Sequence, residues 1–282
     1  MAIVLGPNQY GKAETRVVRI YRDAPRHEIR DLNVSTALRG DFAAAHTDGD
    51  QRNVLPTDSQ KNTCFAFAKQ KGIGCIEDYA LELARHFVHD IGPVASARVD
   101  VEEYAWERVS VGGVEHDHTW VRRGGEIRTA HVTVDAAGES VAAGLRDLVL
   151  LKSTGSQFRG FLVDGYTTLA EADDRVLATS LVARWRYEGT AEAWDELYTD
   201  VRRILVERFA QVDSRALQQT LWDMGKAALE AHPQLAEISL SAPNKHHFLV
   251  DLAPFGLDNP GEVFIAADRP YGLIEATVTR EN

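Results

Sequence analysis

The pattern of apolar and polar positions predicts that strands and helices follow one another in blocks. Residues 14–21 are rich in β-branched and aromatic side chains, and 28–34 form a second, weaker strand, so the two predict an opening hairpin. The run Thr57-Asp58-Ser59 then offers a helix cap before a helix at 60–69, and apolar side chains recur at helical spacing in a second helix at 76–87. The chain therefore begins with two strands and two helices.

Alternation of apolar and polar residues returns after the second helix. Val101 is followed out of phase by Tyr104, which predicts a β-bulge at Glu102-Glu103. Two glycines in 111–113 indicate a turn, and residues 127–134 read as a further strand. These strands complete the first half.

The second half repeats this order without an obvious repeat of letters. Strands are predicted at 148–152 and 181–187, helices at 194–209 and 217–231, and closing strands at 248–252 and 274–278, with an irregular loop at 254–260. Runs of strands and of helices favour antiparallel sheets with helices on one face over a parallel α/β fold. The sequence predicts an α+β protein with two domains, 1–137 and 138–282.

Composition and charge limit the function classes. Hydrophobic residues make up 44% of the chain, and the formal net charge of −11 repels nucleic acid and anionic membranes. Cys64 and Cys75 lack a CxxC spacing, and no run approaches the roughly 18 apolar residues of a membrane span. We expect a cytoplasmic protein with neither a nucleic-acid nor a membrane partner.

Common catalytic motifs are missing from the sequence. There is no GxGxxG after a strand, no Walker loop, no HExxH and no GxSxG. Two histidine pairs, His116 with His118 and His86 with His89, suggest a metal site, but each supplies too few ligands. A polar hairpin end and a helix C-terminus, where histidine suits the helix dipole, explain them more simply. We expect no metal.

One set of polar residues is more informative, although each member has an ordinary explanation. Thr57-Asp58 stands at a helix start, where backbone N–H groups can meet an anion, yet the pair could be only a cap. Lys12 could be a solvated charge, and Asn244 after proline could belong to a turn. Residue types alone leave these alternatives open.

Seven blocks of sequence resemble the urate oxidases, or uricases. They occur in the family's order and cover nearly the whole chain: NQYGK at 8–12, TDSQKNT at 57–63, LKSTGSQF at 151–158, YTTL at 166–169, ARWRY at 183–187, PNKHHF at 243–248 and PYGLI at 270–274. The resemblance implies two tandem tunnelling-fold (T-fold) domains, and a homotetramer in which paired subunits close a β-barrel.

The resemblance also implies an activity and a substrate site. The reaction is oxidation of urate by O2 to 5-hydroxyisourate and hydrogen peroxide, a step of purine degradation, with no metal and no organic cofactor. Arg175 would clamp urate, since its planar fork suits adjacent oxygen and nitrogen atoms, and the Gln218 amide would grip the opposite edge. Phe158 would stack under the ring and Leu169 would close the wall of the pocket. Asp58 and Leu217 would act through their main-chain N–H groups. The implied substrate-binding set is Thr57, Asp58, Phe158, Leu169, Arg175, Leu217, Gln218 and Asn244.

The implied catalytic set is Lys12, Thr57, His246 and Asn244. Lys12 would be the base, the Thr57 hydroxyl would pass the proton, and His246 would orient the hydroxyl and water chain. Asn244 and Thr57 would position first O2 and then the attacking water. In this family the lysine, threonine and aspartate come from one subunit and the rest from its neighbour, so the sites lie at subunit interfaces.

Departures from the family pattern are few, and alternatives stay open. Trp222 stands where many relatives have tyrosine, Leu217 where some have valine, and the tail after Arg280 is short. Phe158 and Leu169 could be core residues, and Arg175 could pair with Asp173 or Asp174. The competing functions are a metal-dependent T-fold pterin or purine enzyme such as a cyclohydrolase, and a binding protein that keeps the pocket without catalysis.

Overall fold

The structure is a computed structural model that describes residues 2–122, 124–190, 193–267 and 269–281. The chain forms two compact units. Unit 1 comprises Met1–Gly144 and Arg186–Asp195, and unit 2 comprises Leu145–Trp185 and Glu196–Asn282. Strands β7 (Gly138–Lys152) and β8 (Leu177–Tyr187) contribute residues to both units.

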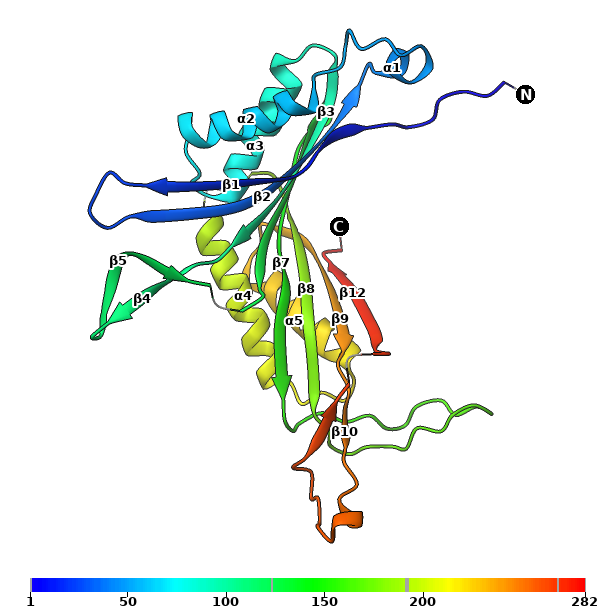
Figure 1. The fold of residues 1–282 in the computed structure, drawn as a ribbon. Helices are drawn as coiled ribbons and strands as arrows, with labels where there is room; N and C mark the ends of the chain where they lie inside the picture. Colours follow the sequence, from blue (N-terminus) through cyan, green and yellow to red (C-terminus); the bar gives the residue numbers. More distant parts are fainter. Residues whose placement is uncertain (1, 123, 191–192, 268, 282) are drawn as a thin grey trace. The chain divides into compact units, whose positions relative to one another are not determined.

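In unit 1 the strands follow the hydrogen-bonded order β1-β2-β3-β6-β7. Neighbours from β1 to β6 pair antiparallel, and α2 and α3 lie on one face of this sheet (Figure 1). A short helix, α1, and a separate hairpin of β4 and β5 complete the unit. The bounds are β1 (Tyr10–Tyr21), β2 (Glu28–Gly40), α1 (Ala43–Thr47), α2 (Thr57–Gln70), α3 (Ile76–Asp90), β3 (Val94–Tyr104), β4 (Glu107–Val111), β5 (Val114–Val121) and β6 (Ile127–Asp135).

In unit 2 the order is β7-β8-β9-β12, and β9 pairs antiparallel with β12. Helix α5 packs on these last two strands. Further elements are α4 (Trp194–Gln211), α5 (Leu217–Ala231), β9 (Leu235–Asn244), the pair β10 (His247–Leu249) and β11 (Phe264–Ala266), the 3-10 turn η1 (Ala253–Phe255) and β12 (Gly272–Thr279).

Each unit has a core of alternating strand residues covered by helix residues. In unit 1, Leu32 and Val34 of β2 and Leu83 and Phe87 of α3 are fully buried. In unit 2, β9 buries alternate residues, including Ile238, Leu240 and Ala242, beneath α5. The α+β arrangement of antiparallel strands with helices on one face is confirmed. Among the described residues, every helix is too short or too polar to cross a membrane.

The predicted bulge at Glu102-Glu103 is wrong. Strand β3 pairs with β2 and β6 in unbroken register through both glutamates. Glu103 keeps the inward phase of Val101, and its carboxylate accepts a hydrogen bond from Arg30 at 2.6 Å. A charged residue at an inward position breaks the apolar alternation, so the sequence pattern resembled a bulge. The strand tolerates this charge because its partner, Arg30, comes from the neighbouring strand β2.

Other differences concern where elements begin and end. The predicted strand at 248–252 stops at Leu249, where its pairing with β11 ends. Strand β9 and helix α1 were not predicted, and β1 starts at Tyr10, ahead of the predicted 14–21. Register shifts in this sheet lie instead in β1, between Lys12 and Thr15, where Glu14 has a φ of 56°, and in β2, between Arg39 and Gly40.

Candidate functional site

The predicted site residues fall into two sets, one in each unit. The set in unit 1 is Lys12, Thr57 and Asp58. The set in unit 2 is Phe158, Leu169, Arg175, Leu217, Gln218, Asn244 and His246. The first set comes from β1 and α2. The second comes from two loop segments, the start of α5, the end of β9 and the connection between β9 and β10.

Hydrogen bonds hold Lys12 near the start of α2. The Lys12 backbone N–H donates to the Thr36 hydroxyl at 3.2 Å, and that hydroxyl donates to the buried Gln60 side chain at 2.7 Å. Gln60 lies in the first turn of α2, so the chain of bonds joins β1 through β2 to the helix. The Lys12 charge also contributes to lowering the pKa of Asp58, after the larger effect of Lys61. The structure thus brings the predicted members of unit 1 together.

The prediction that Thr57-Asp58-Ser59 caps this helix is wrong. Pro56 is the N-cap residue, it has no side-chain hydrogen bond to the helix, and Thr57 is the first helical residue. The first bond of the helix runs from Gln60 N–H to the Pro56 carbonyl at 3.2 Å. The N–H groups of Thr57, Asp58 and Ser59 therefore have no acceptor within the helix, an arrangement that suits an anionic or carbonyl-rich ligand.

In unit 2, main-chain pairing fixes Phe158 and Arg175 beside each other. Phe158 and Ala172 exchange two backbone hydrogen bonds at 2.8 and 2.9 Å, and Arg175 N–H donates to the Ser156 carbonyl at 2.8 Å. As a result, the Arg175 guanidinium lies over the Phe158 ring, 4.9 Å from its centroid. Phe161 stacks on the same ring at 4.9 Å.

The Arg175 guanidinium is half-buried, and burial lowers its pKa. Its Nε is buried and has no hydrogen-bond partner among the residues that the structure describes. The alternative of a surface ion pair is not supported, because Asp173 pairs with Arg159 while Asp174 accepts bonds from the Arg175 backbone and other groups. A buried donor without an acceptor is a candidate ligand-binding group.

Leu169 differs from the other members of this set. Its side chain is 60% exposed, and it belongs to an exposed segment that also carries Leu162 and Tyr166. It is not a core residue of the unit. Its assignment as a pocket wall stays a prediction.

The start of α5 is bound to the segment that carries Phe158. Ser214 is fully buried, donates its N–H to the Gly155 carbonyl at 2.9 Å, and accepts at its own carbonyl from Gln157 N–H at 2.7 Å. Its hydroxyl also accepts from the Thr220 hydroxyl of α5 at 2.8 Å. These bonds hold the helix start, Leu217-Gln218, beside the segment 155–158.

Helix α5 begins without a side-chain cap, as α2 does in the other unit. Ala216 is its N-cap residue, and its first bond runs from Thr220 N–H to the Ala216 carbonyl at 3.2 Å. Leu217 is buried and Gln218 is exposed. The main-chain N–H of Leu217 and the Gln218 amide are therefore available at an open helix start.

Asn244 and His246 flank a backbone bond to β8. Lys245 N–H donates to the Ala178 carbonyl at 2.8 Å, and Ala178 lies three residues after Arg175. Asn244 and His246 are both half-buried, and the His246 ring lies 5.7 Å from Phe248. The structure thus places these residues at the same end of β8 as Arg175.

The histidine pairs have local roles. The ring centroids of His116 and His118 lie 4.5 Å apart, and the ring centroid of His27 lies 5.9 Å from that of His118. His86 bonds to Asp90 through Nδ1 at 2.7 Å. Within the described ranges, no group of three or more histidine, cysteine or acidic side chains is arranged to hold a metal ion.

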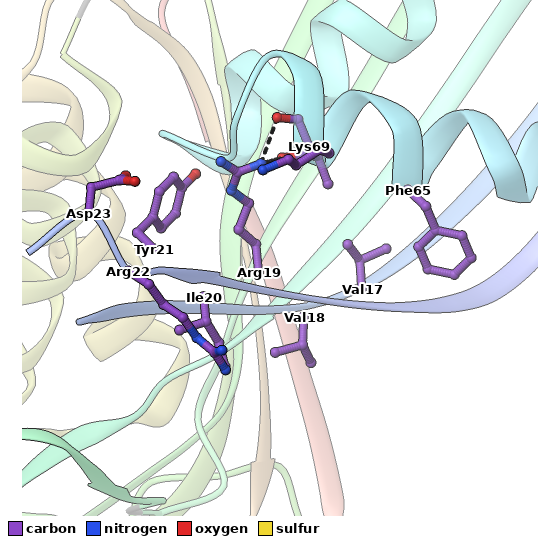
Figure 2. Close-up of a pocket in the computed structure, with 10 residues that line it drawn as sticks. Val17, Val18, Arg19, Ile20, Tyr21, Arg22, Asp23, Phe65 and Lys69 are labelled. Carbon is purple, nitrogen blue, oxygen red and sulfur yellow. Dashed lines mark hydrogen bonds between the residues drawn. The ribbon is translucent and has the colours of Figure 1, made fainter.

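A separate pocket of about 460 Å³ lies between β1 and α2 and contains none of the predicted site residues (Figure 2). Arg19 crosses it and donates to the Lys69 carbonyl at 2.7 Å and to the Ala68 carbonyl. Val17, Tyr21 and the exposed ring of Phe65 form other parts of its lining, together with Val18, Ile20, Arg22 and Asp23.

Sequence reasoning missed residues that assemble the site without being assigned to it. The sequence offers Asp174 only as a possible ion-pair partner of Arg175 and contains no local signal for Ser214. Asp174 joins the segments around 155 and 175, and Ser214 joins the first of these to α5. Glycine beside serine and threonine at 153–156 is typical of a turn, but this composition does not reveal the partner across the turn.

Comparison with known proteins identifies relatives along nearly the whole chain. The uricase family model matches residues 8–133 and 141–275. A uricase of Arthrobacter globiformis is 51% identical over 279 residues, covering 99% of this chain and 91% of the relative. A uricase of Danio rerio is 35% identical over 278 residues, covering 96% of this chain and 93% of the relative.

Solved structures agree with these sequence matches. The crystal structure of the Arthrobacter globiformis uricase has a TM-score of 0.96 at 51% identity and covers 100% of this chain and 96% of that one. A uricase crystal structure from Bacillus fastidious has a TM-score of 0.85 at 28% identity, covering 96% and 93%. The family match, the two sequence relatives and the shared fold together establish that this chain belongs to the uricase family.

Proposed function

We propose that this chain oxidises urate with O2 and water to 5-hydroxyisourate and hydrogen peroxide, in purine degradation, using protein side chains without a metal or an organic cofactor. The observation that carries the proposal is the Arg175 guanidinium, half-buried over Phe158 with a buried Nε that lacks a partner among the described residues. A desolvated guanidinium of this kind favours a planar ligand that presents paired oxygen and nitrogen acceptors. Membership of the uricase family supports urate as that ligand.

Substrate binding is assigned to side chains and to open helix starts. Arg175 and Gln218 grip opposite edges of the purine, Phe158 stacks against its face, and Leu169 closes the wall. The N–H groups of Asp58 and Leu217 supply donors to the remaining ring atoms, because the first N–H groups of a helix have no internal acceptor. Thr57 and Asn244 complete the binding set.

Catalysis is assigned to Lys12, Thr57, His246 and Asn244. Lys12 removes a proton from bound urate through the Thr57 hydroxyl, while His246 orients that hydroxyl and a water molecule. The electron-rich urate anion gives two electrons to O2 in one-electron steps, and the O2 leaves as hydrogen peroxide after taking up two protons. Water, held where O2 was by Asn244 and Thr57, then adds to the oxidised purine.

The division of the proposed site between the two units supports a site that is shared between subunits. We propose a homotetramer in which Lys12, Thr57 and Asp58 of one subunit meet the second set from a neighbour, and in which paired subunits close a β-barrel. The T-fold domains are 1–137 and 138–282, a boundary that falls between the two segments matched by the family model. The proposed location is the cytoplasm, where the free thiols of Cys64 and Cys75 stay reduced.

The decisive experiment mixes metal-free protein with urate and O2. We expect loss of urate absorbance together with release of one hydrogen peroxide per urate. Addition of zinc or iron should not increase the rate. Activity that is absent from the stripped protein and returns with a metal would overturn the cofactor-free mechanism and favour a metal-dependent T-fold enzyme.

A further inference from the structure

The Asp174 carboxylate is the acceptor of four hydrogen bonds from two separate segments. Its Oδ1 accepts the backbone N–H groups of Gly155 at 2.9 Å, Ser156 at 3.3 Å and Arg175 at 3.0 Å. Its Oδ2 accepts the Thr154 hydroxyl. One side chain thus connects the loop before Phe158 to the backbone of Arg175.

The loop is shaped to receive this carboxylate. Gly155 has a φ of +75°, a left-handed conformation that glycine adopts at little cost. This conformation turns two successive N–H groups toward one point, the arrangement that backbone nests use to bind anions. The Thr154 hydroxyl and the backbone N–H groups lower the pKa of Asp174, so the carboxylate is charged at neutral pH.

Asp174 fixes both partners of the Arg175–Phe158 contact without touching the guanidinium. The Arg175 N–H is shared between Asp174 Oδ1 and the Ser156 carbonyl, at 3.0 and 2.8 Å. Phe158 follows two residues after Ser156 on the segment that the same carboxylate holds. Loss of the carboxylate would leave the Gly155 and Ser156 N–H groups without this acceptor and the Arg175 N–H with the Ser156 carbonyl alone, so the backbone pairing would hold the two segments less firmly.

We propose that Asp174 is a positioning residue for substrate binding, holding the Arg175 backbone in the place from which its guanidinium clamps the purine edge. The inference rests on the proposed function of Arg175. Because bidentate contacts depend on small displacements, loosening the backbone of Arg175 weakens binding even though the guanidinium is still present.

Asp173 provides a matched control. It is the neighbouring residue and has the same side chain, but that side chain is 83% exposed and pairs at the surface with Arg159. Such exposed pairs contribute little to stability. Asp173→Ala should therefore change KM and kcat by less than about twofold.

The test compares steady-state kinetics of D174A, D174N, D173A, R175A and the double variant D174A/R175A with urate. We expect D174A to raise KM about tenfold with kcat within about threefold, since binding geometry is affected more than proton transfer. The KM of D174N should lie between those of the unmodified protein and D174A, because the asparagine amide oxygen still accepts backbone hydrogen bonds but carries no charge. The double variant should bind urate no more weakly than R175A, since Asp174 acts through Arg175.

Three outcomes would overturn the inference. The first is a normal KM in D174A beside a raised KM in R175A. The second is a KM in the double variant that equals the product of the two single effects. The third is a KM in D173A that is raised as much as in D174A. A normal KM in R175A would instead overturn the substrate assignment itself. If D174A fails to fold, T154V offers a milder test, because it removes one of the four hydrogen bonds to Asp174. An unchanged KM in both T154V and D174N would also overturn the inference.

Discussion

The Arg175 guanidinium carbon lies 4.9 Å from the centroid of the Phe158 ring, the ring on which we propose that the purine stacks. Substrate binding must therefore exchange this contact for contacts of both groups with the purine. A partly exposed cation–π contact is worth about 0.5–1 kcal/mol, whereas hydrogen bonds to a charged group are worth about 1.5–3 kcal/mol each. The exchange favours the bound state.

This relationship predicts different losses for the two residues. Arg175→Ala should raise KM for urate by about 30-fold or more, because a charge-assisted bidentate contact is lost. Phe158→Leu should raise KM by about tenfold, since one stacking contact is worth about 1–3 kcal/mol. Phe161→Leu is the control: Phe161 stacks on Phe158 and is not assigned to the ligand, so its effect should be smaller. Equal KM values for F158L and F161L would contradict the stacking assignment.

Lys12→Met tests the base. We expect kcat to fall by about 10²- to 10⁴-fold, the usual contribution of general acid–base catalysis, with KM changed only a few-fold. Lys226→Met is the control, because Lys226 is exposed and pairs at 3.7 Å with Glu230 on the same helix. A K12M variant with normal kcat would remove Lys12 from the catalytic set.

A mixing experiment tests whether each site is shared between subunits. K12M and R175A subunits are each expected to be nearly inactive alone. If the two sets come from different subunits, random reassembly of an equal mixture should leave about a quarter of the sites with both sets intact. Activity should then return to about a quarter of that of the unmodified protein. Activity that does not return, in a mixture shown to contain mixed oligomers, would place both sets in one chain.

The sequence predicted the helices of both units well, because their apolar stripes depend only on local spacing. Ile76, Leu83 and Phe87 are buried in α3 as that spacing requires. Strand phase was less reliable at Glu103. Its inward carboxylate is stabilised by Arg30 of another strand, a pairing that no local pattern contains.

The same reason explains what could be predicted of the site. The family resemblance pointed to Arg175 and Phe158, and Thr57-Asp58 was correctly placed at a helix start. The sequence could not show that Pro56 takes the cap position, because threonine, aspartate and serine suit both a cap and a first helical turn. Nor could the sequence reveal the contacts of Asp174 with residues 154–156, which lie 18 to 20 positions before it.

Burial should make both cysteines slow to react. Burial, with the charge of Asp195 and a hydrogen bond to it, raises the pKa of Cys75 to about 11, and burial raises the pKa of Cys64 to about 12. The thiolate is the reactive form, so at pH 8 the thiolate of Cys75 should be about 100-fold scarcer than that of an ordinary cysteine. We expect slow alkylation of the folded protein, with a rate that rises tenfold per pH unit from 7 to 9. Rapid labelling at pH 7, with the unfolded protein as the reference, would contradict this.

Gly225 of α5 tests the packing that supports the open helix start at Leu217. A Cβ at this position would lie 2.6 Å from Val278 Cγ2 and 3.2 Å from Ile238 Cγ2, on the two strands beneath the helix. Alanine in place of glycine gains about 1 kcal/mol in helix propensity, but overpacking a core costs about 1–3 kcal/mol. Because valine and isoleucine side chains are stiff, we expect the clash to exceed the gain.

Gly225→Ala should therefore lower the free energy of unfolding by about 1–2 kcal/mol and reduce Tm by a few degrees. Gly74→Ala is the control, since a Cβ there meets open space, and its Tm should change by less than about one degree. An increase of Tm in G225A would mean that α5 moves away from β9 and β12 at no cost. In that case KM for urate should rise as well, because Leu217 and Gln218 would move with the helix.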